Sequence, residues 1–109
     1  MIQVLVELDE EDRLLSFKAS GHANSGRKGH DIVCAAVTIL LRTTVQALGS
    51  VQTETGAEER GLLTFRVLKY YENQSELLRY AAEFLWLGIT SLQEEYPQAV
   101  QCKKYGGKC

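Results

Sequence analysis

Residues 21–36, which read GHANSGRKGHDIVCAA, gather side chains that could do chemistry on a thiol. They contain two histidines, an aspartate, three glycines and the cysteine Cys34, and they lead directly into a long apolar segment. A cysteine attacks a carbonyl when a base accepts its proton, and the usual base is a histidine. The segment therefore indicates either a cysteine-histidine nucleophilic site or, on the simpler interpretation, a polar turn followed by a core cysteine.

The aspartate before the apolar segment predicts where a helix begins. Asp31 is expected to be the N-cap, which places Cys34 at the third helical position. Backbone N–H groups in a first turn lack intrahelical acceptors, and the helix macrodipole is positive at this end. We therefore expect the helix start to favour the thiolate of Cys34 and to bind the oxyanion that forms when the thiolate attacks a carbonyl.

Two histidines compete for the role of the base. His22 falls where a strand is expected to end, and the loop at residues 24–30 can fold back to bring it beside Cys34. His30 directly precedes the expected N-cap, and a residue there generally points away from the first turn, so the geometry favours His22. Glycines in this stretch permit positive φ or the close approach of a bound peptide, or they simply turn the chain. These glycines are Gly21, Gly26 and Gly29.

Alternating apolar residues predict the strands that position these groups. The expected strands are residues 2–8, 13–20, 62–71 and 99–105, with an additional short strand near 51–55. The first two form a hairpin in which Leu15, Phe17 and Ala19 lie on the buried face.

Two helices complete the set of expected elements. The first spans residues 31–48 and follows the glycine-rich loop. Asn73 and Glu76 have the spacing of a capping box for the second helix, and Pro97 ends it. Gly88 inside the second helix costs about 1 kcal/mol relative to alanine, which indicates close packing against another element.

The order of these elements predicts the fold class. Hairpins, rather than regular strand-helix-strand crossovers, indicate an α+β fold with a mainly antiparallel sheet and two helices packed on one face, in the order ββαβ(β)αβ. A chain of 109 residues can form one hydrophobic core. We therefore expect a single domain at residues 1–109, with residues 103–109 as a flexible tail.

Charge and cysteine content exclude several classes of protein. The net charge of -2 gives no field that would draw the whole molecule onto nucleic acid or a membrane surface. The N-terminus turns acidic, and no segment reaches the roughly 18 apolar residues of a membrane span, so we expect a cytoplasmic location. Three cysteines without a C-x-x-C pair do not support a disulfide framework or a metal site, and no cofactor is expected.

The segment GHANSGRKGHDIVCAAVTIL closely resembles the signature of the ribosomal-processing cysteine protease family, Prp. The matching residues are Gly21, His22, Ala23, Gly29, Asp31, Ile32, Val33, Cys34, Ala35, Ala36 and Thr38. The length and the element order of the chain are also similar to that family. The resemblance implies a homodimeric endopeptidase whose peptide partner is the N-terminal extension of large-subunit ribosomal protein twenty-seven.

The resemblance also implies a role for each matching polar residue. Cys34 is the nucleophile and His22 is the base, whereas His30 occupies a position that the family pattern leaves open. Asp31 fixes the loop and the helix start, with orientation of His22 as a second role. Thr38 stands where serine is expected and keeps the hydroxyl group. An extended substrate is expected to cross the loop that carries the three glycines.

Two other functions stay open beside the protease. One is a non-catalytic ribosome-associated binding protein whose basic end contacts RNA with salt-dependent affinity. The residues of that end are Lys103, Lys104, Tyr105 and Lys108. The other is a thiol redox protein in which Cys102 resolves an oxidised Cys34, so that mild peroxide joins the two in a disulfide.

Overall fold

The computed structural model describes residues 1–21, 30–57 and 62–107, with residues 30 and 31 described by their backbone alone. The elements in chain order are β1 (Ile2–Leu8), β2 (Leu14–Ser20), α1 (His30–Ala47), β3 (Gln52–Gly56), β4 (Leu62–Lys69), the short 3-10 helix η1 (Glu72–Gln74), α2 (Ser75–Glu95) and β5 (Val100–Tyr105). This order confirms the expected α+β fold and includes the additional short strand, β3.

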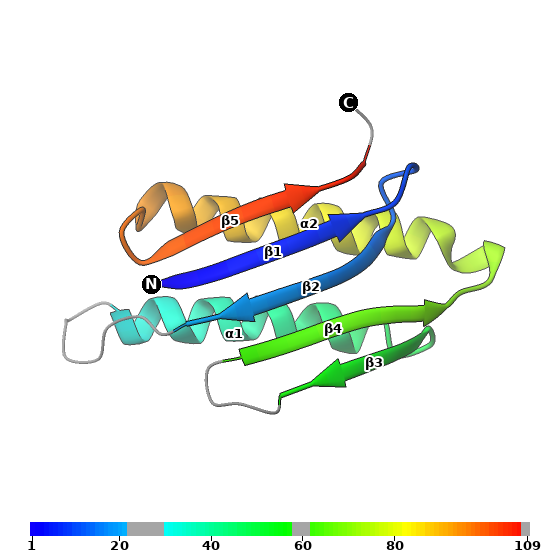
Figure 1. Ribbon diagram of the computed structural model, residues 1–109, viewed down its shortest axis with the longest axis horizontal. Coiled ribbons are helices and arrows are strands. Elements are labelled where there is room, and N and C mark those ends of the chain that lie inside the picture. Colours follow the sequence, from blue (N-terminus) through cyan, green and yellow to red (C-terminus); the bar gives the residue numbers. More distant parts are fainter. Residues whose placement is uncertain (22–29, 58–61, 108–109) are drawn as a thin grey trace.

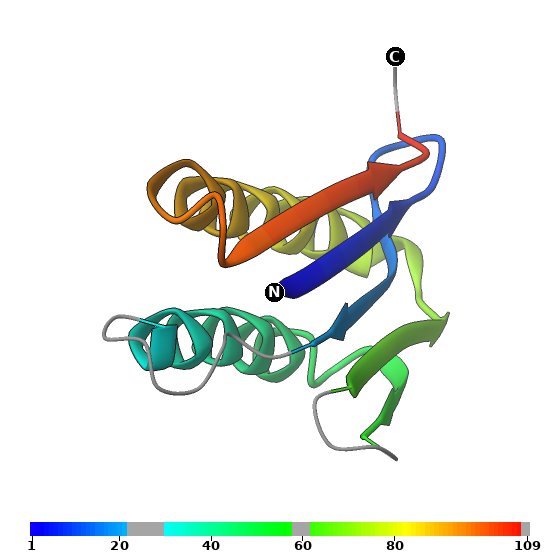
Figure 2. The same cartoon turned by 60° about the vertical axis from the view of Figure 1, so that its left-hand side comes forward.

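A single sheet collects the strands of the described chain in the order β3-β4-β2-β1-β5. Neighbouring strands are antiparallel except β1 and β5, which are parallel. A parallel partner needs a crossover connection, and α2 supplies it before β5. Both helices cover the same face of the sheet, with α2 behind β5 and β1 and α1 behind β2 and β4 (Figure 1, Figure 2). The mainly antiparallel sheet with two helices on one face is therefore confirmed.

The hydrophobic core lies between the sheet and the two helices. Its largest fully buried side chains are Phe17, Phe65, Leu14, Leu48, Leu78, Leu85 and Ile89. Phe17 of β2 and Phe65 of β4 are directly opposite in the strand register, and their rings stack with centroids 4.9 Å apart. Aromatic pairs of this kind stabilise a sheet beyond the area they bury. The stack joins β2 to β4 at the centre of the sheet.

The β1–β2 hairpin contains one irregularity that the alternating pattern did not predict. Leu14, not Leu15, is fully buried, and Leu15 is only half-buried. Glu7 lies opposite Ser16 whereas Leu8 lies opposite Leu14, so β2 has one extra residue at this point. Such a bulge shifts the alternation by one residue. The expectation for Leu15 is therefore wrong, while the rest of β2 faces the core as predicted.

Neither helix begins at the capping residue that the sequence predicted. The first helical residue of α1 is His30, so Asp31 is the second residue of the helix and not its N-cap. An acidic residue is also favoured inside a first turn, where the macrodipole is positive, so the residue type alone does not separate the two positions. The chain enters α2 through η1, where the Tyr71 N–H donates to Gln74 Oε1 at 2.9 Å. This bond stands in place of the expected capping box of Asn73 and Glu76.

Gly88 marks the place where the two helices approach each other. A Cβ atom at Gly88 would lie 2.8 Å from Cδ2 of Leu40 on α1, which is closer than real Cβ contacts. The close packing expected at this glycine is confirmed.

The last strand lies where the alternating pattern placed it, since β5 covers residues 100–105 of the expected 99–105. Lys103, Lys104 and Tyr105 were also counted in the expected flexible tail at residues 103–109, but they pair with residues 5–7 of β1. The pairing with β1 holds these three residues in the sheet. The chain then turns at Gly106, whose φ is +78°.

Candidate active site

Cys34 lies near the start of α1. In Figure 1, α1 begins at the end of the sheet where β2 finishes. The side chain is half-buried, carries a free thiol and packs against the hydrophobic core. The same side chain lines an open cavity of about 430 Å³. The thiol is therefore held in place by packing and is still reachable from outside.

The cavity beside Cys34 is a groove between α1 and the ends of three strands. One wall is a face of α1 that extends over two turns: Cys34, Val37, Thr38, Leu41 and Arg42. The opposite wall comes from β1, from β2 with Gly21, and from β4: Ile2, Ala19, Ser20, Gly21, Leu62 and Leu63. Most of these side chains are apolar. The arrangement suits an extended peptide with apolar side chains, with the thiol at one end.

Gly21 fixes the chain where it leaves β2. Its φ is +94°, and a Cβ atom there would lie 2.1 Å from the carbonyl oxygen of Met1. Side chains rarely adopt this conformation, and no side chain fits the available space, so glycine is required. The expected positive φ is confirmed for Gly21, which approaches the chain's own backbone. His22 is the next residue, and His22, Gly26 and Gly29 lie outside the described residues.

Cys34 is the fifth residue of α1, not the third as the expected N-cap implied. In a regular helix whose first residue is His30, the N–H of the fourth helical residue already donates to the N-cap carbonyl, so the helical N–H groups without an intrahelical acceptor are those of residues 30–32. The effect of the macrodipole falls off within this first turn. The helix start is therefore expected to stabilise a Cys34 thiolate less than the sequence indicated.

Two of the other predicted residues lie close to Cys34 on α1. Thr38 is exposed, follows Cys34 by one helical turn and lines the same groove. Asp31 belongs to the first turn, and its side chain lies outside the described residues. The structure thus brings Cys34, Thr38 and Gly21 to one groove.

Sequence reasoning missed the other residues of the groove. Val37, Leu41 and Arg42 recur at helical spacing after Cys34, so a helical projection of this segment could have found them. Leu62 and Leu63 come from a distant strand. Their place depends on the pairing of β2 with β4, where Ser20 lies opposite Leu62, and no local signal predicts that pairing.

Cys102 has different surroundings from Cys34. Gln93 Oε1 accepts the N–H of Cys102 at 2.7 Å and its thiol at 3.3 Å. Burial raises the pKa of the Cys102 thiol. A thiol with a raised pKa is less often the reactive thiolate at neutral pH. These surroundings disfavour Cys102 as the resolving thiol of a redox protein.

The basic residues at the end of β5 do not form one patch. Lys103 and Tyr105 line a shallow cavity with Gln3 and Leu5 of β1. Lys104 points to the other side of the strand, where its Nζ lies 5.0 Å from the centre of the Trp86 ring. Alternate side chains of a strand face opposite ways, so Lys103 and Lys104 lie on different faces of β5, and Lys108 lies outside the described residues.

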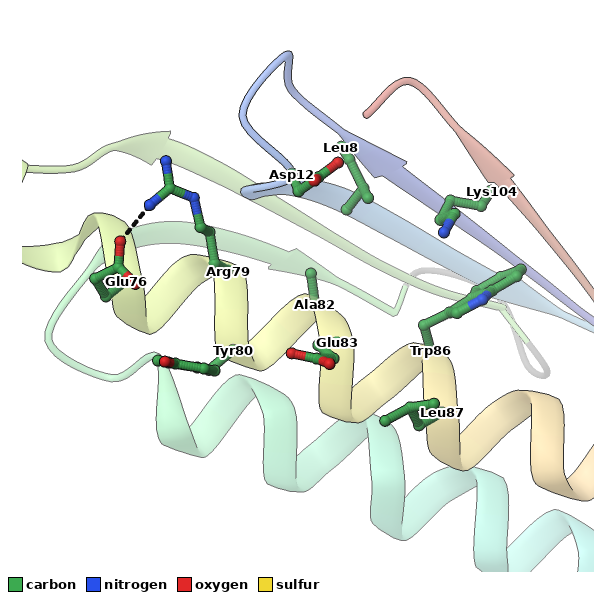
Figure 3. A pocket seen from close by; sticks show the side chains of 10 residues that line it. All are labelled: Leu8, Asp12, Glu76, Arg79, Tyr80, Ala82, Glu83, Trp86, Leu87 and Lys104. Carbon is green, nitrogen blue, oxygen red and sulfur yellow. Dashed lines mark hydrogen bonds and ion pairs between the residues drawn. The ribbon is translucent and has the colours of Figure 1, made fainter. Parts of the chain in front are cut away.

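A larger cavity, of about 570 Å³, lies between α2 and the ends of β1 and β5 (Figure 3). Figure 3 shows Leu8, Asp12 and Lys104 reaching toward it from the sheet side, opposite side chains of α2. Arg79 and Glu76 form an ion pair at its edge. The described lining contains no cysteine or histidine. The described lining of the larger cavity therefore offers no thiol-histidine pair, and cavity size alone does not identify the candidate active site.

Two further findings concern metals and membranes. Within the three described ranges, no group of three or more His, Cys, Asp and Glu side chains is arranged to hold a metal ion. Neither α1 nor α2, the long helices of the described chain, is apolar enough over its length to cross a membrane.

Comparison with known sequences connects this groove to one protein family. The family model described as cysteine protease Prp matches residues 1–101. The ribosomal processing cysteine protease Prp of Bacillus subtilis is 40% identical over 48 residues, which are 44% of this chain and 43% of that protein. The protein of the same name from Staphylococcus aureus is 24% identical over 105 residues, covering 93% of this chain and 96% of that one.

Solved structures share the fold over nearly the whole chain. SMU.848 from Streptococcus mutans superposes with a TM-score of 0.77 at 36% identity, covering 97% of this chain and 95% of that one. Prp from S. aureus in complex with a substrate peptide gives a TM-score of 0.79 at 21% identity, covering 95% and 99%. Another structure of the S. aureus protein holds a covalently linked product peptide.

Proposed function

This chain belongs to the cysteine protease Prp family, and from that membership we propose that it removes the N-terminal extension of large-subunit ribosomal protein twenty-seven during ribosome maturation. The S. aureus relative is named as a ribosomal processing protease and has been crystallised with a substrate peptide. The partner in this proposal is a peptide, and direct binding of nucleic acid is not part of it. The reaction takes place in the cytoplasm, where ribosomes mature.

The half-buried thiol of Cys34 at one end of an open groove is the observation that carries the proposal. A nucleophile that attacks peptides must be anchored by packing and still be reachable by an extended substrate. Cys34 meets both requirements, because it packs against the core and lines the groove. Gly21 fixes the end of β2 beside the same groove, and His22 is the next residue. This connection supports His22 as the base.

Peptide cleavage then proceeds in two steps. His22 accepts the proton of the Cys34 thiol, and the sulfur bonds to the scissile carbonyl carbon while the carbonyl oxygen becomes an oxyanion. Cα–Cβ bonds in a helix tilt toward its N-terminus, so the Cys34 side chain leans over the first turn, whose free N–H groups can bind this oxyanion. The C–N bond breaks, and the leaving amine takes the proton from His22. Water, losing a proton to His22, hydrolyses the thioester and restores the thiol.

The remaining predicted residues have supporting roles in this proposal. Asp31 holds the loop and the helix start, and it orients His22. Thr38 contributes its hydroxyl group to the groove one turn beyond the nucleophile. Gly21, Gly26 and Gly29 belong to the segment over which the extended substrate lies.

We also propose that the protein is a homodimer that associates through the outer face of its helices. Apolar side chains are exposed on both helices of that face, among them Ile39 on α1 and Phe84 on α2. A groove of about 520 Å³ between the helices is floored by small residues, including Ala35, Ala36 and Gly88. The exposed apolar side chains and the groove lie on the same face. In a two-fold dimer, each copy can therefore place exposed side chains such as Phe84 in the groove of the other copy, so a second copy fits this surface.

Incubation with the N-terminal segment of the cognate ribosomal protein tests the proposed activity. The wild-type protein should cut one bond, and mass spectrometry should find both products. Cys34→Ser should leave the segment intact, and His22→Gln should lower kcat by about 10²- to 10⁴-fold, as loss of a general base does. His30→Gln should cleave at the wild-type rate. An uncut segment with the wild-type protein, or full activity in Cys34→Ser, would overturn the proposal.

A further inference from the structure

The peptide bond between Met1 and Ile2 lies beside the groove that holds Cys34. Ile2 is buried and lines this groove, and Gly21 lines it from the neighbouring strand. Continued by one residue, the antiparallel register of β1 and β2 places Ile2 opposite Gly21. The first residues of β1 therefore belong to the immediate surroundings of the nucleophile, far from it in the sequence.

Gly21 packs directly against this peptide. A Cβ atom at Gly21 would lie 2.1 Å from the carbonyl oxygen of Met1, 3.2 Å from its carbonyl carbon and 3.5 Å from Cα of Ile2. The peptide group is planar and resists twisting, so it presents a firm surface to the chain that passes over it. The Met1 carbonyl therefore limits where the chain can go as it leaves β2.

The same peptide is held from its other side by β5. The Ile2 N–H donates to the Ala99 carbonyl oxygen at 2.8 Å, and Ile2 lies opposite Val100 in the parallel pairing of β1 with β5. The side chains of these three residues are buried in the core. A continuous support thus extends from the start of β5, through the start of β1, to the end of β2.

We propose that the backbone carbonyl of Met1 is a positioning group for the catalytic base, because it fixes Gly21 and so sets the direction in which the chain continues to His22. The inference rests on the proposed protease activity, in which His22 accepts the proton of Cys34. A base displaced by about 1 Å can cost a reaction about 10²-fold, so loss of this carbonyl should lower kcat by about 10- to 100-fold.

The test removes and restores this one carbonyl. The protein is made with a cleavable N-terminal fusion, so that the first residue after cleavage can be chosen. A chain that starts at Ile2 lacks the Met1 carbonyl but keeps the nitrogen that donates to Ala99. Its kcat on the N-terminal segment of the cognate ribosomal protein should fall by about 10- to 100-fold. Met1→Ala keeps the carbonyl and, as the conservative variant, should recover the wild-type kcat.

Alkylation of Cys34 separates a positioning role from a merely structural one. A base beside the thiol raises the fraction of thiolate at neutral pH, and the thiolate is the form that reacts. Limiting iodoacetamide should therefore label Cys34 more slowly in the folded chain that starts at Ile2, and should label Cys102 at the wild-type rate. The N-terminal ammonium group, now one residue nearer the groove, would by itself favour the thiolate, so slower labelling reports the lost carbonyl.

Gly21→Ala disturbs the same contact from the opposite side and leaves the N-terminus unchanged. It should also slow the labelling of Cys34, measured at a temperature where circular dichroism shows the variant to be folded. Gly49→Ala is the matched control, because Gly49 does not line the groove and has no positive φ. It should label Cys34 at the wild-type rate. If the chain that starts at Ile2 does not fold, the comparison of these two variants decides the question.

Two results would overturn the role of the Met1 carbonyl and leave the protease standing. One is wild-type cleavage and labelling in the folded chain that starts at Ile2. The other is an equal loss of kcat in Met1→Ala, which would assign the effect to the side chain. Cleavage of no peptide by the wild-type protein, as by Cys34→Ser, would overturn both the positioning role and the proposed function.

Discussion

Cys34 and Cys102 are both half-buried free thiols, yet their surroundings differ. Cys34 lines an open groove, and the residue that follows the fixed Gly21 is a histidine. Cys102 donates its S–H to Gln93, which stabilises the protonated thiol, and burial raises its pKa. A buried cysteine is therefore a weak signal by itself, and its neighbours decide its reactivity.

This contrast predicts which thiol reacts first with an alkylating agent. At pH 7 and limiting iodoacetamide, peptide mass spectrometry should find Cys34 modified well before Cys102. Labelling of Cys102 should require a higher pH than that of an ordinary thiol, because its raised pKa keeps it protonated. A Gln93→Ala variant removes the acceptor and should speed the labelling of Cys102 while leaving Cys34 unchanged. Equal rates for the two thiols in the wild-type protein would contradict the assignment.

The residues of the site differ in how far the sequence could predict them. Cys34 and Gly21 could be singled out, because a cysteine at a helix start and a glycine at a strand end have direct chemical and conformational consequences. Arg42 could not, because an arginine on a helix is ordinary until the facing wall is known. That wall includes Leu62 of β4, which the chain reaches only after α1 and β3. Contacts between distant segments carry no local sequence signal.

Among the elements near the site, the backbone directly after β2 is tightly constrained at Gly21. Gly21→Ala should lower the free energy of unfolding by at least about 2 kcal/mol, because it adds a strained φ to a collision with the Met1 carbonyl. Thermal denaturation followed by circular dichroism measures the change. Gly49→Ala is the control, since a Cβ atom there would lie 3.2 Å from the Gln46 carbonyl oxygen and Gly49 has no positive φ. Similar losses in both variants would contradict the special role of Gly21.

The β1–β2 turn is stabilised by a carboxylate that accepts several hydrogen bonds. Asp9 accepts the Arg13 Nε–H at 2.6 Å and the backbone N–H groups of Glu11 and Arg13 at 2.8 and 2.9 Å. Arg13 also donates to Ser75 Oγ at 3.0 Å, which connects the turn to the start of α2. Burial alone would raise the pKa of Asp9, but these hydrogen bonds and the Arg13 charge outweigh it and hold the pKa below the usual 3.8.

A lowered folded-state pKa predicts how stability changes in acid. The unfolded chain binds the proton first, so the contribution of Asp9 is complete above pH 3.8 and is lost as the pH falls through the lower folded-state value. Asp9→Asn should cost about 1 kcal/mol at pH 7 and should flatten the loss of stability below pH 4, measured by urea unfolding from pH 7 to pH 2. An unchanged acid profile in Asp9→Asn would show that other carboxylates dominate.

The strands were easier to predict than their irregularities and the helix starts. Alternation in residues 2–8 is a local property, and β1 has those bounds. The bulge that buries Leu14 depends on the partner strand, where the register changes between Glu7 and Leu8. The start of α1 at His30 depends on how the chain leaves the preceding loop, so a favourable capping residue was not sufficient to locate it.

For the whole molecule, the two layers leave very different outer surfaces. The described strands carry one ion pair, Arg66 with Glu54, and expose two large apolar side chains, Leu68 and Tyr105. The helix layer exposes more of them: Ile32, Ile39, Tyr80, Phe84 and Leu87. Apolar residues scattered singly need no explanation, but a face shared by two packed helices is typical of an interface. The principal extents of 45 × 31 × 18 Å give this broad face room for the roughly 800 Å² per partner that a standard interface buries.

The helix face makes a prediction about the oligomeric state. Phe84 is the most exposed large apolar residue of the described chain, at 72%, so in a two-fold dimer it should be a central contact. Analytical ultracentrifugation at tens of micromolar should find a dimer of the wild-type protein and a folded monomer of Phe84→Glu, because a buried, unpaired carboxylate opposes association. Leu68→Glu, on β4 and 53% exposed, adds the same charge elsewhere and should stay dimeric. A monomeric wild-type protein, or a dimer that survives Phe84→Glu, would exclude this surface as the interface.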